Sequence, residues 1–395
     1  MPVRARLWTR YRVVCLSVCG FLPLAPVSAT QSGIASDEEV IFFNTAARLD
    51  TVAGQWVAPI HGWIFEPETD SIRRMAVLAV LREALDVDDE RAGERLFNRR
   101  AAAFLVDNES GKTLTLRVGD RTVTVGPSEQ NGHLTGSIRL SLEEADRLSR
   151  PDKFGRQWVE FELVTSDSDR RRFSAKTVLV QPAGLSVISD IDDTIKITEV
   201  TDHEEMIENT FFKPYRPVPG MARLYQGWAH QGAVIHFVSA SPWQLYEPLT
   251  EFMSEHGFPA ATFHLKTFYW KDSRFLSLFA DPLDYKLKVV EPLIRSFPQR
   301  QFILVGDSGE KDPEAYGLLA RKYPDQVAFI LIRAMENESP DSARFRAAFE
   351  GIPPQRWHVF SNTEELTKVA FPGIANSRPA TVSAIAPAGS EKAEE

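Results

Sequence analysis

Alternating apolar and polar residues dominate the first half of the chain. From Glu38 to about Pro182, short runs of this kind are separated by turn residues, which is typical of strands with one buried face. Five of these runs predict strands, over residues 112–118, 121–126, 133–142, 157–164 and 173–180. Their spacing predicts a small antiparallel sandwich or barrel, which we place at residues 36–183.

The same half contains two predicted helices and a predicted strand pair. Ser71–Leu85 has a serine in the N-cap position and a wide apolar face, and Asp89–Arg100 is a second helical segment. Gln55–Pro67 predicts two strands around a turn, with Trp56 and Trp63 in the core. Because no catalytic combination of residues stands out, we interpret this domain as a binding or scaffolding module.

Continuous apolar runs replace the alternating ones from Leu185 onward. Four of them, residues 185–190, 233–241, 301–309 and 327–335, are each followed by a helix-like segment. Unalternating strands separated by helices are typical of a parallel sheet buried on both faces. We therefore expect an α/β fold over residues 184–371, a Rossmann-like parallel sheet with helices on both faces. Residues 372–395, rich in Ala, Pro, Ser and Glu, predict a disordered tail.

Polar residues follow the apolar runs at the strand ends, where parallel sheets bind ligands. Asp190, Ser239 and Asp307 all fall at such ends, and Lys286 begins a helix-like segment before the third run. Two strand-end acids, a hydroxyl and a lysine in this order are what an aspartate-based phosphoryl transferase needs. Residues 190–194 could instead be an acidic turn that caps a helix, because Asp and Thr are favoured N-caps.

These segments resemble a known group of enzymes. "DIDDT", "VSAS", Lys286 and "GDSGEKD" are similar to the four motifs of the haloacid dehalogenase-like phosphohydrolases. More narrowly, "SDIDDTIK", "SASPWQLY" and "GDSGEKDPEAY" resemble the actin-patch-associated phosphatidate phosphatases, which are relatives of the lipins. "HGWIFEP" in the first half resembles that family's amino-terminal region. The resemblance implies a haloacid dehalogenase-like fold, and the short stretch between Thr194 and Ser239 leaves little room for a cap domain.

The resemblance also implies a role for each residue. Asp190 would attack phosphorus, and Asp192 would act as the acid and base. Mg²⁺ would be bound by the carboxylates of Asp190 and Asp307 and by the backbone carbonyl of Asp192. The remaining implied roles are phosphoryl binding by Ser239 and Lys286, orientation of Lys286 or of the metal shell by Asp312, and a phosphatase-type hydroxyl at Thr194. Mg²⁺ and Lys286 would together supply the positive charge that tolerates such clustered acids.

Some assignments keep alternatives. Lys288 lies on the same segment as Lys286, although a lysine directly after an aromatic residue fits the family better. Asp193 is either a support for the site or a solvated turn residue. Phe263–Phe279, rich in aromatic residues, is either core or an apolar rim for acyl chains.

The implied function is hydrolysis of phosphatidate, a phospholipid substrate, to diacylglycerol and phosphate, with peripheral membrane contact. The alternatives are a phosphatase of other phosphomonoesters or phosphoproteins, and a non-catalytic protein that binds phospholipid or acts as an interaction module. A net charge of −9 gives no argument for a nucleic-acid partner.

Residues 1–29 predict a secretory signal. Four arginines precede an apolar stretch that ends in the small residues Val27-Ser28-Ala29. We expect cleavage near Ala29 and a secreted or periplasmic protein. Because Cys15 and Cys19 both lie inside this signal, the mature chain would have no disulfide.

Overall fold

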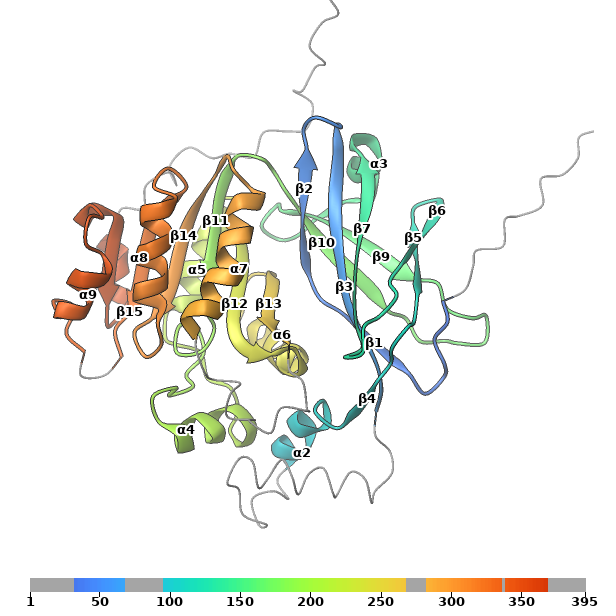
Figure 1. Cartoon of the computed structure of the whole chain (residues 1–395), viewed down its shortest axis with the longest axis horizontal. Helices are drawn as coiled ribbons and strands as arrows, with labels where there is room; N and C mark the ends of the chain where they lie inside the picture. The colour runs from blue at the N-terminus through green and yellow to red at the C-terminus, as the bar shows by residue number, and fades with distance from the viewer. Residues whose placement is uncertain (1–31, 68–94, 268–281, 336–337, 369–395) are drawn as a thin grey trace, which may run out of the picture.

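The computed structural model describes residues 32–67, 95–267, 282–335 and 338–368, which form two β-sheets joined near residue 183 (Figure 1). The predicted signal, the predicted helix at Ser71–Leu85 and the predicted tail lie outside these residues. Among the described helices, none combines the length and the hydropathy that crossing a bilayer requires.

The first sheet lies in the N-terminal half and contains all five strands that alternation predicts. Its core gathers apolar residues from most of its strands, for example Ala47, Ile60, Leu116, Leu134 and Phe161. All of its pairings are antiparallel except that of β10 with β2, which is parallel. The elements are β1 (Glu39–Phe42), β2 (Thr45–Asp50), β3 (Gln55–Pro67), α2 (Arg95–Ala102), β4 (Val106–Asn108), β5 (Leu114–Val118), β6 (Arg121–Val125), β7 (His133–Ser141), α3 (Leu142–Leu148), β8 (Arg150–Pro151), β9 (Gln157–Leu163) and β10 (Ser174–Val180).

The prediction of a strand pair at Gln55–Pro67 is wrong, because these residues form the single strand β3. Within β3, Gly62 lets the ring of Phe42 approach; a Cβ at Gly62 would lie 3.1 Å from that ring. Trp56 and Trp63 are buried as predicted. The described part of the helix predicted at Asp89–Arg100 is confirmed as α2.

The second sheet is parallel throughout, as predicted. Its strands are β11 (Gly184–Ser189), β12 (Val234–Pro242), β13 (Thr262–Lys266), β14 (Arg300–Asp307), β15 (Val327–Arg333) and β16 (Trp357–Phe360), in the spatial order β13-β12-β11-β14-β15-β16. The chain therefore starts in the middle of the sheet and changes direction between β11 and β14. In sheets of this order, a crevice for ligands forms at that point, outside the carboxyl ends of the strands.

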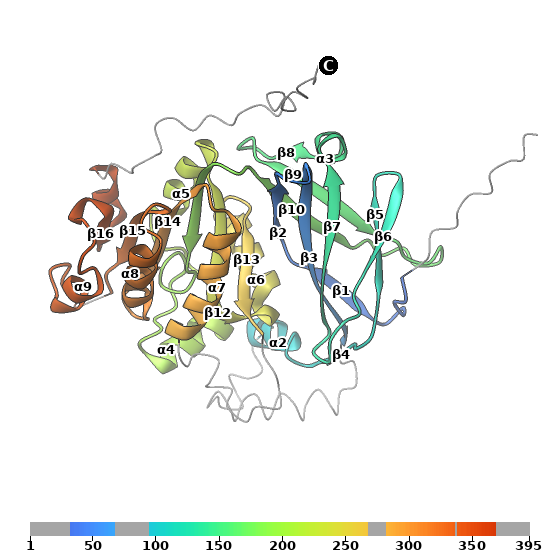
Figure 2. The same ribbon diagram turned by 45° about the horizontal axis from the view of Figure 1, so that its top comes forward.

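Helices cover both faces of the parallel sheet. Alternate residues of the central strands, such as Val187 and Val305, face α5 (Met221–His230) and α6 (Tyr246–Glu255). Their neighbours, such as Ile188 and Leu304, face α7 (Pro282–Ser296) and α8 (Asp312–Lys322). Figure 2 shows α7 and α8 in front of the sheet and α5 behind it. The remaining helices are α4 (His203–Ile207), the π-helix η2 (Glu208–Phe212), η3 (Trp243–Leu245), α9 (Ala343–Ala348), η5 (Pro354–Arg356) and η6 (Thr363–Lys368).

The two halves pack against each other through a shared core. Phe43 and Trp63 of the first half belong to the same cluster as Trp243 and Phe263 of the second. Phe263 therefore confirms core packing for the described start of the aromatic segment, whereas residues 268–279 lie outside the described chain. The boundary that we predict at residues 183–184 falls between the end of β10 and the start of β11.

Neutral buried histidines at this interface predict a stability that falls with acidity. His61 Nε2 lies 3.0 Å from His133 Nδ1, and the ring of His61 packs edge-on against Trp243. Burial lowers the pKa of His133 to about 4. Because the unfolded chain protonates at about 6.5, the stability from a neutral histidine is complete above that pH and is lost as the pH falls toward 4.

We expect His133→Gln to reduce the acid sensitivity of folding. Between pH 6.5 and 5, the free energy of unfolding of the wild type should fall by about 2 kcal/mol more than that of the variant. Urea unfolding at both pH values measures this difference, and His203→Gln is the control because His203 is exposed. Equal pH dependence in wild type and His133→Gln would contradict the prediction.

Candidate active site

Asp190 follows β11 directly and lies at the point where the strand order reverses. Its side chain is buried, and neither carboxylate oxygen has a hydrogen-bond partner among the described residues. The nearest described cation is Lys286, with Nζ 3.7 Å from Asp190 Oδ2. Burial raises the pKa of Asp190 well above the usual range, although Lys286 opposes this shift. A buried carboxylate without hydrogen bonds is costly unless a ligand completes its surroundings.

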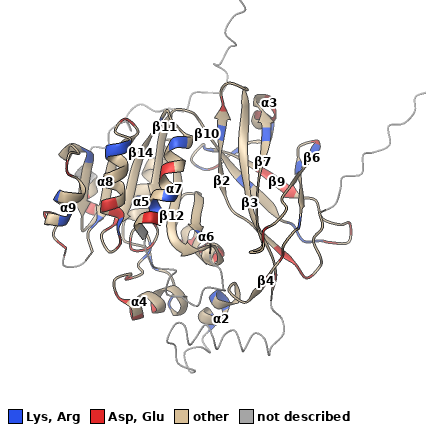
Figure 3. Cartoon of the chain, viewed as in Figure 1, with Lys and Arg blue, Asp and Glu red and all other residues tan. Residues whose placement is uncertain are grey.

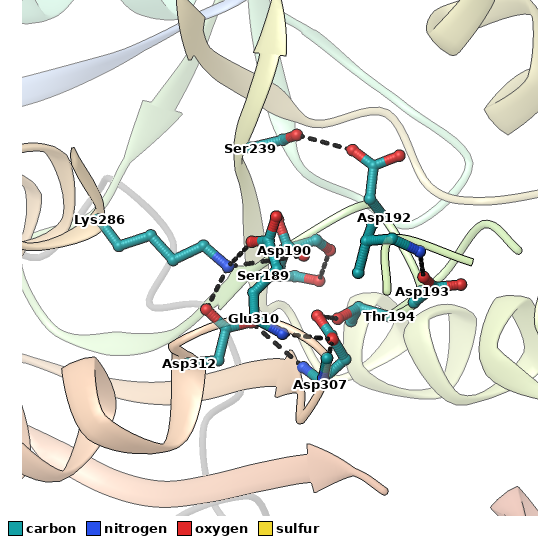
Figure 4. Close-up of polar contacts among 12 residues, drawn as sticks. Ser189, Asp190, Asp192, Asp193, Thr194, Ser239, Lys286, Asp307, Glu310 and Asp312 are labelled. Carbon is teal, nitrogen blue, oxygen red and sulfur yellow. Dashed lines mark hydrogen bonds and ion pairs between the residues drawn. The ribbon is translucent and has the colours of Figure 1, made fainter. Parts of the chain in front are cut away.

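Lys286 extends from α7 toward Asp190 and is fully buried (Figure 4). Its ammonium group lies 2.7 Å from Glu310 Oε2 and donates to Asp312 Oδ1. Burial alone would lower the pKa of Lys286, but the neighbouring acids, led by Asp190, raise it well above its usual value. Lys288 is exposed, so the geometry favours Lys286 as the lysine of the site.

Asp307 ends β14 next to Asp190. Ligand atoms of Asp190, Asp307 and Glu310 all lie within 4.8 Å of one another, which would allow them to bind one ion. Asp307 Oδ1 accepts hydrogen bonds from the backbone N–H of Gly309 (2.7 Å) and Glu310 (3.2 Å), and Oδ2 lies 3.5 Å from Thr194 Oγ1. Burial raises the pKa of Asp307 well above its usual range. This all-oxygen group with a partnerless carboxylate fits a hard divalent cation.

Asp312 contacts Lys286, whereas Glu310 lies in the acid group with Asp190 and Asp307. Asp312 Oδ2 accepts the backbone N–H of Asp307 at 3.1 Å, and Oδ1 accepts Lys286. Asp312 therefore orients Lys286 and the end of β14, which is one of the two roles that we predict for it. Glu310 completes the acid group, and our reading of the sequence missed it. The signal was its place three residues after Asp307, in the loop that follows the strand.

Asp192 is surrounded by hydrogen-bond donors. Its Oδ2 accepts from Ser239 Oγ at 3.0 Å and from Ser241 Oγ at 2.8 Å. Its Oδ1 lies 2.8 Å from Lys196 Nζ and accepts from Thr198 Oγ1 at 2.8 Å. Although burial alone would raise it, the ion pair with Lys196 and these hydrogen bonds lower the pKa of Asp192 to about 2.

Lys196 is therefore a second source of positive charge that the sequence analysis did not consider, although "SDIDDTIK" ends on it. Acidic and basic positions lie close together at this end of the parallel sheet (Figure 3). Ser239, which we predict as a phosphoryl-binding residue, directs its hydroxyl to Asp192 in this structure.

Asp193 shapes the loop behind the site. Its backbone is left-handed (φ 52°), a conformation that Asp tolerates better than most residues. Its buried carboxylate accepts the backbone N–H groups of Thr198, Glu199 and Val200 at 2.8, 2.9 and 2.7 Å. Of our two interpretations, the solvated turn is wrong, and Asp193 supports the loop that presents Asp192.

The second half is an open α/β domain, with an acid group and a lysine where the strand order reverses. Residues 185–334 match the family model described as "Phosphatidate phosphatase APP1, catalytic domain". This segment of the chain is therefore similar to that family of catalytic domains.

Two yeast proteins are similar to parts of the chain. Phosphatidate phosphatase APP1 of Saccharomyces cerevisiae is 35% identical over 167 residues, which cover 41% of this chain and 28% of the yeast protein. An uncharacterized protein of Schizosaccharomyces pombe is 28% identical over 189 residues, which cover 47% of this chain and 31% of that protein. The chain thus matches about a third of the length of these relatives.

Proposed function

We propose that the protein is a divalent-cation-dependent phosphatase that hydrolyses phosphatidate through a phosphorylated Asp190. The observation that carries this proposal is the buried, partnerless carboxylate of Asp190, which lies beside Lys286 and within ion-binding distance of Asp307 and Glu310. The match of this segment to a phosphatidate phosphatase catalytic domain supports the choice of reaction.

In the first step, a carboxylate oxygen of Asp190 forms a bond to phosphorus while the bond between phosphorus and the substrate alcohol breaks. A protonated Asp192 donates its proton to the departing alcohol oxygen. In the second step, water attacks phosphorus and gives a proton to Asp192, and the bond from phosphorus to Asp190 breaks to release phosphate. The proton gained in the second step is the one donated in the next turnover.

The lowered pKa of Asp192 favours its ionised form, which the second step requires as the base. Asp190, Asp307 and Glu310 would bind Mg²⁺, which when bound neutralises charge on the phosphoryl oxygens. Lys286 is positioned to bind the same oxygens, and Asp312 keeps its ammonium group aimed at Asp190. Only α4 and η2 of the described segments follow β11 before α5 returns to the sheet, which agrees with a minimal cap.

We expect long-chain phosphatidate to be a better substrate than a short, soluble phosphomonoester. A site without a large cap can approach a headgroup at a lipid surface, and glycerol phosphate offers the same phosphoryl group without acyl chains. The test compares kcat/KM for phosphatidate in mixed micelles with that for glycerol phosphate, with Mg²⁺ and with EDTA. We expect a higher value for phosphatidate and loss of both activities in EDTA.

Each other outcome has a distinct meaning. Equal or faster turnover of glycerol phosphate would contradict the lipid substrate and favour a general phosphomonoesterase. Binding to phosphatidate vesicles without phosphate release would favour a non-catalytic lipid-binding protein. Activity that persists in EDTA would contradict the divalent cation.

A further inference from the structure

We propose that Arg100, on helix α2 of the N-terminal half, is a positioning residue for Asp192. The inference rests on the proposed phosphatase function, because it concerns the acid and base of that reaction. The inference gives the N-terminal half a role in positioning a catalytic group, beyond the binding or scaffolding role that the sequence predicts.

The link begins with an unusual arginine. Arg100 is only 7% exposed, and among the described residues its guanidinium group forms no ion pair with a carboxylate. Instead, Nη1 donates to the backbone carbonyls of Thr210 and Lys213, both at 2.8 Å. A buried charge is costly unless hydrogen bonds compensate it. The two hydrogen bonds therefore fix the position of Arg100 and of the backbone from Thr210 to Lys213.

Tyr215 carries the link into the parallel-sheet half. The Cζ atom of Arg100 lies 3.8 Å from the centre of the Tyr215 ring, and Lys196 Nζ lies 4.8 Å from the same centre. One aromatic ring thus contacts both cations, an arrangement that a ring's electron-rich faces favour. Tyr215 is itself fixed, since its hydroxyl donates to the carbonyl of Thr210 at 3.2 Å.

Lys196 completes the link to Asp192. Lys196 is 1% exposed, and its ammonium group contacts Asp192 Oδ1 at 2.8 Å and Thr198 Oγ1. The backbone follows the same path, because Ile197 N–H donates to the carbonyl of Arg216 and Val218 N–H to that of Ile195, each at 2.9 Å. A change at Arg100 would therefore reach Asp192 through two neighbouring side chains and not through the sheet.

The test uses Arg100→Ala, Arg100→Lys and the control Arg99→Ala. Arg99 is the adjacent arginine of α2, but it is largely exposed and pairs with Glu251. For Arg100→Ala with p-nitrophenyl phosphate, we expect kcat to fall about ten- to a hundredfold with KM nearly unchanged, because a misplaced catalytic group costs rate more than binding. Arg100→Lys should recover part of kcat, and Arg99→Ala should match the wild type.

A second readout separates positioning from a general loss of structure. Nitrophenolate leaves without a proton donor, so Asp190 should still be phosphorylated, whereas the second step needs Asp192. In Arg100→Ala, the hydroxylamine-sensitive phosphoenzyme found after acid quench should therefore rise above the wild-type level. If kcat is unchanged, or if kcat and phosphoenzyme fall together, the inference is wrong.

A crystal structure of Arg100→Ala supplies a readout independent of turnover. We expect Tyr215 and Lys196 to shift and the ion pair between Lys196 and Asp192 to lengthen, while β11 and β14 superpose on the wild type. An unchanged ion pair would overturn the inference. A wild type that forms no phosphoenzyme would contradict the proposed mechanism separately. If Arg100→Ala does not fold, Tyr215→Leu removes the central ring and tests the same link.

Discussion

Replacing Asp190 with asparagine should reduce phosphatase activity by about four to six orders of magnitude, the loss expected when a covalent nucleophile is removed. The amide is a poor nucleophile and a weaker ligand for a divalent cation. The change is nearly isosteric, and the carboxylate of Asp190 accepts no hydrogen bond among the described residues, so the fold should persist. Steady-state phosphate release measures the loss, and thermal unfolding checks the fold.

Ser308→Ala is the matched control, because Ser308 follows the neighbouring strand end and lies in the sequence "GDSGE", which resembles a serine nucleophile loop. Its hydroxyl oxygen accepts the backbone N–H of Met335 at 2.9 Å, so it braces a loop. Losing one such hydrogen bond costs about 1 kcal/mol of stability and should leave most of the activity. The opposite ranking of the two variants would favour a serine hydrolase over an aspartate nucleophile.

Lys286→Met should affect both activity and stability. The substitution removes the cation that faces Asp190, Glu310 and Asp312, and it leaves the buried Asp190 and Asp312 without it. We expect kcat to fall about a hundred- to a thousandfold, as for other groups that stabilise developing charge. Removing one partner of a buried ion pair should also cost about 3–5 kcal/mol of stability.

Lys288→Met provides the comparison, since Lys288 is exposed two positions along the same helix. Kinetics and urea unfolding of both variants, in saturating Mg²⁺, measure the two effects. If Lys288→Met were the more damaging change, our assignment of the lysine would be wrong.

The parallel sheet was predictable from sequence because both of its faces are buried. Its strands are continuous apolar runs, and their carboxyl ends necessarily meet at one edge, so Asp190 and Asp307 could be paired in advance. The single strand β3 was not predictable in the same way. Gly62 and Pro59 are typical turn residues, and only the close approach of Phe42 and an exposed position explain them in a strand.

In the site, too, residues within a motif could be predicted, whereas contacts between distant segments could not. Asp192 and Lys286 could be predicted from motifs, but Lys196 and Glu310, which form ion pairs with them, could not. Lys196 and Glu310 are ordinary polar residues in sequence, and their roles depend on which way a loop turns after a strand. Arg100 lies in a different half of the chain from Asp192, so no local pattern connects them.

The contact between Asn44 and strand β13 bears on whether the two halves of the chain can be separated. Strand β13 is an edge of the parallel sheet, and on its open side the backbone N–H of Phe263 donates to the carbonyl of Asn44, while Asn44 Nδ2 donates to the carbonyl of Ala261. An uncovered edge strand is a template for pairing with other chains. The N-terminal half therefore covers the edge strand β13 and prevents it from pairing with a second molecule. A fragment that contains only the second half would expose β13 and should self-associate more readily.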